Sequence, residues 1–146
     1  MKKIKNFIQI NEQIATAGQP TKKQFKQIAQ AGYNVVLNLA MHNRGALKEE
    51  DKIVTKNGML YIHIPITWKN PELDNFIFAL QTLKYLQRLE KKVFVHCIMN
   101  WRVSMLMYHY KKSVLFKKNV KLKTPNDFEA NKKWEKILEL DLKNKI

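Results

Sequence analysis

The feature that most constrains the fold of this chain is the alternation of short apolar segments with longer amphipathic ones. Val35 to Leu39 and Val93 to His96 have the composition of buried strands. Phe76 to Leu86 and Arg102 to Leu115 repeat apolar residues at helical spacing. Strands that alternate with helices are typical of an α/β domain with a mainly parallel central sheet flanked by helices. We therefore predict this fold class.

The remaining segments extend the same alternation over a chain of 146 residues, a length that fits one domain covering residues 1–146. Thr21 and Gln24 have the spacing of a capping box, which predicts that a helix starts there and ends at Gly32. We also predict strands over Phe7 to Ile10 and Leu60 to Ile64, and a turn over Ala17 to Pro20. A further helix is predicted over Lys48 to Asn57, and the helix containing Phe76 is predicted to start at Asn70-Pro71. The last predicted helix covers 124–142 and starts at Thr124-Pro125.

The charge of the chain suggests an anionic partner but does not identify one. The net charge is +15 and the sequence pI is about 9.9. Arginine occurs only at positions 44, 88 and 102, so the basic character comes from lysine. Because recognition surfaces usually favour arginine, we interpret most of this charge as a solvated surface. No repeat or interleaved aromatic-basic motif is present, so nucleic-acid binding is not predicted.

The cysteine content and the hydropathy pattern limit which cofactors and which cellular location we expect. Cys97 is the only cysteine, so no internal disulfide can form, and no Cys/His cluster has the spacing of zinc ligands. We expect no metal and no cofactor. Lys5, Asn6 and Gln9 interrupt the apolar character of the N-terminus, and no apolar run reaches membrane-spanning length. These patterns predict a cytoplasmic protein without a membrane span, and they give no indication of oligomeric state.

The segment with the clearest chemical potential lies between the strand ending at His96 and the helix that follows. Ligands of open α/β sheets bind at the carboxyl ends of strands, which is where Cys97 falls. A loop there aims backbone N–H groups at one centre, beside the positive end of the helix dipole, and this field favours a thiolate. Arg102 offers a planar fork of donors to an oxyanion, and Ser104 has a hydroxyl to donate. The alternative is a buried structural cysteine beside a surface arginine, but the combined context favours a nucleophile.

These residues resemble a known family. The segment from His96 to Ser104 resembles the signature loop of the cysteine-dependent protein tyrosine and dual-specificity phosphatases. The segments 16–21, 32–39 and 58–65 are similar to small bacterial phosphatase-like domains, including the phosphatase-like domain of beta-lactamase hydrolase-like proteins. The resemblance covers about residues 7–116 and leaves the C-terminal tail unassigned.

The resemblance implies a phosphatase-like fold and a phosphorylated substrate, either a protein or a small molecule. In the family the cysteine attacks phosphorus to form a phosphocysteine, the arginine holds the phosphoryl oxygens, and a serine or threonine assists breakdown. By position these catalytic roles fall on Cys97, Arg102 and Ser104. The loop residues that would bind the substrate are Ile98, Met99, Asn100, Trp101, Arg102 and Val103.

Two departures from the family pattern bear on activity. Four residues separate Cys97 from Arg102 where the family usually has five, and the loop lacks the family's glycine. A shorter loop makes a tighter cradle with fewer N–H groups, and Trp101 narrows its mouth. The loop after Pro65 lacks the family's aspartic general acid, so the first carboxylates are Glu72 and Asp74. Acidic residues in a first helical turn commonly interact with the helix dipole instead.

Several functions therefore remain open. The first is a phosphatase that hydrolyses phosphate monoesters, and the second is a pseudophosphatase that only binds phosphorylated ligands. The third is a sulfurtransferase of the rhodanese type, whose loops are also short, often contain an arginine in this place and use a cysteine persulfide. His96 is expected to orient the loop by hydrogen bonds in any of these.

Overall fold

A five-stranded sheet forms the centre of the molecule in the computed structural model, which describes residues 1–146. Its strand order is β1-β2-β5-β3-β4. Strands β2, β5, β3 and β4 are parallel, and β1 pairs with β2 in the antiparallel direction. The predicted α/β class with a mainly parallel sheet is confirmed. The strands are β1 (Ile8–Gln9), β2 (Ile14–Ala17), β3 (Val35–Asn38), β4 (Leu60–His63) and β5 (Val93–His96).

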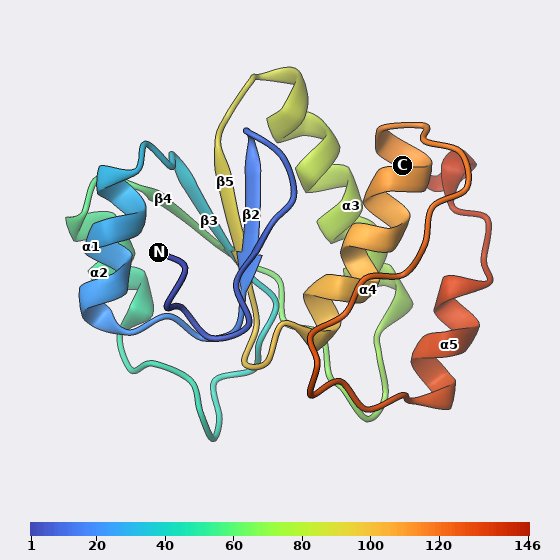
Figure 1. The fold of residues 1–146 in the computed structure, drawn as a ribbon, viewed down its shortest axis with the longest axis horizontal. Helices are drawn as coiled ribbons and strands as arrows, with labels where there is room; N and C mark the ends of the chain where they lie inside the picture. The colour runs from blue at the N-terminus through green and yellow to red at the C-terminus, as the bar shows by residue number, and fades with distance from the viewer.

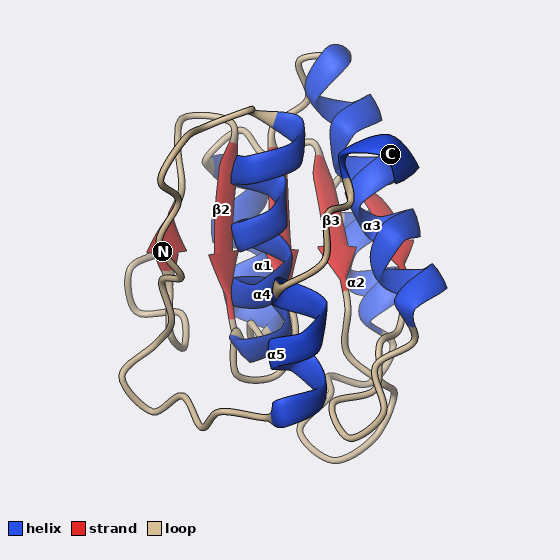
Figure 2. Ribbon diagram, turned by 90° about the vertical axis from the view of Figure 1, so that its right-hand side faces the viewer, coloured by secondary structure: helices blue, strands red, loops and turns tan.

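Helices cover both faces of this sheet (Figure 1). On one face lie α1 (Lys22–Gln30) and α2 (Glu50–Lys56). On the other lie α3 (Leu73–Arg88) and α4 (Trp101–His109), with α5 (Lys132–Leu138) on their outer side. Figure 2 shows α4 lying along the sheet on the near side, between β2 and β3 in this view. The chain returns from α4 through a π-helical turn (Tyr110–Val114) and ends in a short 3₁₀ helix (Lys143–Lys145).

Each face of the sheet has its own hydrophobic core because successive strand residues point to opposite sides. Val93 and Val95 of β5 belong to the larger cluster of 24 buried residues, which includes Phe76 of α3 and Trp134 of α5. Phe94, between them, belongs to the cluster of 10 under α1 and α2. Since β5 is buried on both faces, its contiguous apolar sequence is the expected pattern for a central parallel strand.

Several predicted boundaries are confirmed and others are wrong. The capping box is present, since Thr21 Oγ1 accepts from Gln24 N and Gln24 Oε1 accepts from Thr21 N. Strand β2 was not predicted, because its residues Ile14–Ala17 include two alanines and carry little β signal. Helix α2 is shorter than predicted, and the segment predicted as one helix from Arg102 to Leu115 is divided between α4 and the π-helical turn.

Two predicted helix starts are corrected by the structure. Helix α3 starts at Leu73, so Glu72 and not Asn70 occupies the N-cap position. Helix α5 starts at Lys132, where the Asn131 side chain accepts from Lys133 N, and not at Thr124-Pro125. The intervening segment is irregular because Phe128 leaves the helical path and packs on the aromatic rings beside the loop after β5. No helix combines the length and apolarity that a bilayer crossing requires.

Candidate active site

The loop that follows β5 lies where three parallel strands end together. Cys97 N donates to the carbonyl of Ala17 at the end of β2 over 3.3 Å, and Leu39 N donates to the carbonyl of His96 over 2.9 Å. Cys97 therefore lies between the chains leaving β2 and β3, at the carboxyl edge where the sequence predicted a site. Four residues after Cys97 the chain enters α4 at Trp101.

The backbone amides of this loop are unpaired. None of the six consecutive N–H groups from Ile98 to Val103 donates a hydrogen bond within the protein. The carbonyls are used instead: Ile98 O accepts from Gln19 N over 3.0 Å, and Met99 O accepts from Asn6 Nδ2 over 2.9 Å. A helix start leaves its first N–H groups free in any protein, and here the preceding loop extends that set. Such a run of free donors next to a helix N-terminus is suited to an anion.

Asn100 explains how the loop turns without glycine. Its φ angle of 64° is left-handed, a conformation that asparagine tolerates better than most residues. The buried side chain does not cap α4. Its Nδ2 donates to Asn6 O over 2.8 Å and to Thr16 Oγ1 over 3.1 Å, which ties the turn to the N-terminal segment and β2. The loop thus reaches a left-handed turn at an asparagine that its own side chain holds in place.

Gly18 brings the chain leaving β2 into direct contact with the loop. A Cβ atom built at Gly18 would lie 2.4 Å from the carbonyl oxygen of Ile98, far inside van der Waals contact. Only a residue without a side chain allows this approach. The Gly18 requirement therefore comes from backbone packing against the loop, and it belongs to the segment 16–21 that carries part of the family resemblance.

A pocket of about 530 Å³ opens beside the loop. Cys97 contributes to its wall, although no part of this residue is exposed to solvent, so the sulfur lies beneath the side chains that face the opening. Trp68 and Trp101 form an aromatic wall, with ring centroids 5.5 Å apart. The full lining is Met41, Asn43, Arg44, Thr67, Trp68, Lys69, Cys97, Ile98, Met99, Trp101 and Arg102.

The predicted site residues separate into those that line this pocket and those that do not. Cys97, Ile98, Met99, Trp101 and Arg102 line it. Arg102 is half-buried, and its Nη1 donates to the carbonyl of Ile66 over 3.0 Å. The five candidates outside the lining are Glu72, Asp74, Asn100, Val103 and Ser104.

Ser104 and the two carboxylates have other partners. Ser104 Oγ donates to the carbonyl of Asn100 over 2.6 Å, within its own helix. Glu72 accepts from both the amide and the hydroxyl of Thr67, each over 2.8 Å, and the backbone hydrogen bond from Thr67 lowers the pKa of Glu72. Neither Glu72 nor Asp74 lines the pocket. Glu72 is therefore an ionised brace for the loop after β4.

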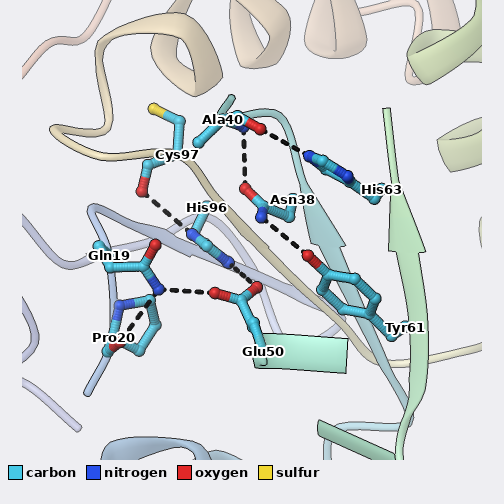
Figure 3. Close-up of polar contacts among 9 residues, drawn as sticks. All are labelled: Gln19, Pro20, Asn38, Ala40, Glu50, Tyr61, His63, His96 and Cys97. Carbon is cyan, nitrogen blue, oxygen red and sulfur yellow. Dashed lines mark hydrogen bonds and ion pairs between the residues drawn. The ribbon is translucent and has the colours of Figure 1, made fainter. Parts of the chain in front are cut away.

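Behind Cys97 lies a buried ion pair that sequence reasoning did not find. His96 Nε2 lies 2.7 Å from Glu50 Oε2, and His96 Nδ1 lies 3.0 Å from the carbonyl oxygen of Cys97 (Figure 3). Gln19 Nε2 donates to the other Glu50 oxygen over 2.7 Å. Both ring nitrogens thus face oxygen acceptors, an arrangement satisfied when each carries a proton and His96 is an imidazolium. This role for Glu50 depends on the contact between α2 and the end of β5, which the sequence does not show.

The electrostatics of this pair favour an ionised carboxylate. Glu50 is only 1% exposed, and burial by itself would raise its pKa. Hydrogen bonds from His96 and Gln19, together with the charge of His96, outweigh burial and lower the pKa of Glu50 from its ordinary value. The result is a buried His96–Glu50 contact at the residue directly before the cysteine, and the second ring nitrogen of His96 lies against the Cys97 carbonyl.

Comparison with known proteins supports one family. No protein-family model matches the chain, and no curated protein matches it. Among solved structures, a DUF442 protein from Shewanella putrefaciens CN-32 superposes with a TM-score of 0.84 at 31% identity, over 94% of this chain and 91% of that chain. Tk-PTP superposes at 0.73 with 17% identity, covering 97% and 98%. PTPMT1, solved in complex with PI(5)P, superposes at 0.65 with 17% identity, covering 76% and 74%. The two more distant similarities establish a shared fold.

The Glu50–His96 pair generates a prediction on stability. Glu50→Gln should lower the free energy of unfolding by about 3–5 kcal/mol near neutral pH, because it leaves a buried cation without its partner. The folded pKa of Glu50 lies below the ordinary value of 4.5, so its stabilising contribution is complete above 4.5 and is lost as pH falls through the folded value. Urea unfolding at a series of pH values should therefore bring wild type and Glu50→Gln together in acid.

The neighbouring residue supplies the control for this prediction. Glu49 is exposed and lies 3.4 Å from Lys52 at the surface. Glu49→Gln removes the same charge one residue away and should change the free energy of unfolding by less than about 0.5 kcal/mol. Equal losses in the two variants, or a Glu50→Gln loss that persists unchanged in acid, would contradict the assignment of a buried ion pair.

Proposed function

Because the chain belongs to the DUF442 family of phosphatase-like proteins, we propose that it hydrolyses phosphate monoesters at Cys97 through a phosphocysteine intermediate. The observation that supports this most directly is the run of six unpaired amides from Ile98 to Val103 beside Arg102. A phosphoryl group has three non-bridging oxygens, and this set supplies neutral donors and one guanidinium for them. Such donors act on charge that develops in the transition state and need no rearrangement to do so.

The proposed reaction has two steps. The Cys97 thiolate attacks phosphorus, so that an S–P bond forms while the P–O bond to the leaving group breaks and the leaving oxygen takes up a proton from solvent water. Water then attacks the phosphocysteine, which releases phosphate and restores the thiolate. The His96 ring holds the carbonyl of Cys97, and so fixes the backbone from which the nucleophile projects. Since Cys97 has no exposed surface, an ester must first displace one of the pocket-lining side chains.

The pocket provides no general acid to protonate the leaving group. No aspartate or glutamate lines the pocket. Glu72 is held ionised by Thr67, which is the wrong protonation state for a general acid. Asp74 also lies outside the lining. The proposal therefore assigns catalysis to Cys97 and Arg102 alone, and it gives Ser104, Glu72 and Asp74 no direct step.

A prediction on Arg102 tests the anion cradle. Arg102→Lys keeps the charge but removes the planar fork of donors. Turnover of p-nitrophenyl phosphate should fall by about 10²–10³, and the affinity for inorganic phosphate should fall with it. Arg88→Lys, a change of the same type on the exposed end of α3, is the control and should leave both unchanged. Wild-type turnover and phosphate affinity in Arg102→Lys would remove Arg102 from the site.

A second prediction follows from the missing general acid. Such an acid contributes about 10²–10⁴ in rate, mainly for leaving groups that are poor without a proton. In a series of aryl phosphates, kcat/KM should fall steeply as the pKa of the leaving phenol rises, and alkyl phosphates should hardly react. Glu72→Gln and Asp74→Asn should change this dependence little. A flat dependence that one of these substitutions abolishes would identify an acid. Phosphate binding without turnover of any ester would instead support a pseudophosphatase.

The absence of a carboxylate in the pocket also favours a second candidate, sulfur transfer. In that reaction the Cys97 thiolate takes the outer sulfur of thiosulfate, the S–S bond of thiosulfate breaks, and sulfite leaves with a persulfide remaining on Cys97. No leaving oxygen has to be protonated, so no general acid is needed. The same loop amides would hold the negative terminal sulfur.

Mass spectrometry separates the two candidates, because the chain has one cysteine and any adduct can be assigned. After incubation with thiosulfate, the phosphatase proposal predicts no added sulfur. A stable gain of about 32 Da that is absent from Cys97→Ser would establish persulfide chemistry and favour the sulfurtransferase.

A further inference from the structure

The few arginines of this chain are not spread evenly. Lysine and arginine together number 27, and only Arg44, Arg88 and Arg102 are arginines. Two of these three, Arg44 and Arg102, line the same pocket. A lysine-rich composition would explain lysines at any surface position but not this placement. Arginine differs from lysine in its planar set of donors, which matches phosphate and carboxylate oxygens. The distribution therefore suggests that Arg44, like Arg102, contacts an anion in this pocket.

Arg44 is carried by a loop that packs directly on the Cys97 loop. The segment 41–46 is folded by two hydrogen bonds, from Asn43 N to Met41 O and from Ala46 N to Asn43 O, each 2.9 Å. Gly45 adopts a left-handed φ of 91°, and a Cβ atom built there would lie 3.0 Å from Ile98 Cγ2. This close approach places Arg44 at the pocket, although its side chain is exposed and has no hydrogen bond or ion pair in the protein.

Lys69 contributes to the lining from the loop after β4. That loop is braced at Thr67 by Glu72 and at Ile66 by Arg102, so the position of Lys69 depends on the same contacts that hold the site together. The Lys69 side chain is also exposed and makes no ion pair. The lining thus contains three cationic side chains and no carboxylate, with apolar Met41, Trp68 and Trp101 among them.

We propose that Arg44 and Lys69 form a second anion subsite, so that this pocket selects phosphate monoesters whose leaving group carries a further phosphate or carboxylate. The inference rests on the proposed function for the placement of the reacting phosphoryl group on the loop amides and Arg102. That first group leaves two cations of the lining without a counter-charge. A ligand with a second anion neutralises them.

Inorganic phosphate and pyrophosphate are the probes for this subsite. Calorimetry should give the wild type at least about a tenfold tighter Kd for pyrophosphate than for phosphate. The ratio of the two Kd values should fall severalfold in Arg44→Gln and approach one in the double variant Arg44→Gln, Lys69→Gln. Arg44→Lys should recover only part of the ratio, because it restores charge without the fork. Arg88→Gln removes the same charge from a remote helix end and should keep the wild-type ratio.

The outcomes separate this inference from the proposed hydrolysis when p-nitrophenyl phosphate turnover is measured on the same preparations. Turnover without a preference for pyrophosphate would overturn the subsite and leave the hydrolysis standing. A preference that depends on Arg44, without turnover of any ester, would keep the subsite and overturn the hydrolysis. A preference that persists in the double variant, or that Arg88→Gln reduces equally, would show a general effect of net charge and overturn the subsite. Failure of both ions to bind, together with no turnover of any ester, would overturn both.

Discussion

The buried contact between Glu50 and His96 is the interaction on which the organisation of this molecule depends. It joins α2, on one face of the sheet, to the last residue of the central strand β5. Leaving either charge alone in this position would be costly, so the pair fixes α2, Gln19 and β5 relative to one another. The other ring nitrogen of His96 then holds the Cys97 carbonyl, and with it the direction in which the chain leaves the strand. The conformation of the Cys97 loop therefore depends on contacts made on the opposite face of the sheet.

The C-terminal tail, for which the sequence resemblance gave no role, contributes to the same pocket. Trp134 of α5 stacks on Trp68, with centroids 5.4 Å apart, and its indole nitrogen donates to the Trp68 carbonyl. Asp127 accepts a hydrogen bond from the Trp101 indole over 3.1 Å, and this bond lowers the pKa of Asp127. Both tryptophans of the pocket wall are thus positioned by residues beyond the predicted loop. Substitutions in the tail would change the shape of the pocket.

The sequence was sufficient for the parts of the fold that have a strong periodic signal. The central strand β5, the capping box at Thr21 and the position of Cys97 between strand and helix were predicted and are present. Strand β2 was missed because Ile14–Ala17 has small residues whose burial comes from pairing with β5. Glu50 lies in a segment for which the sequence predicted a helix and no further role. Its role depends on a contact with a residue 46 positions away, which no local pattern encodes.

Local pattern also failed where tertiary packing overrides propensity. Thr124-Pro125 has the composition of a helix start, but the next residues are irregular and Phe128 packs against Trp68 and Trp101. Asn100 was expected to bind the substrate as one of the loop residues. Its left-handed turn and its bonds to Asn6 and Thr16 became visible once β2 and the N-terminal segment were placed beside it.

The contact between Gly18 and the carbonyl of Ile98 has a consequence for the mutational tolerance of the chain. Residue 18 does not line the pocket, yet its α-hydrogen occupies space into which no carbon atom fits. A methyl group there would push on the peptide between Ile98 and Met99, whose N–H belongs to the run of free amides. Such a substitution would therefore lower ligand affinity as well as stability. Variation in the glycine would be strongly restricted, whereas exposed pocket residues such as Arg44 could change and redirect specificity. Gly18 therefore determines the geometry of the loop, whereas Arg44 influences which ligand binds, and the two positions can diverge independently.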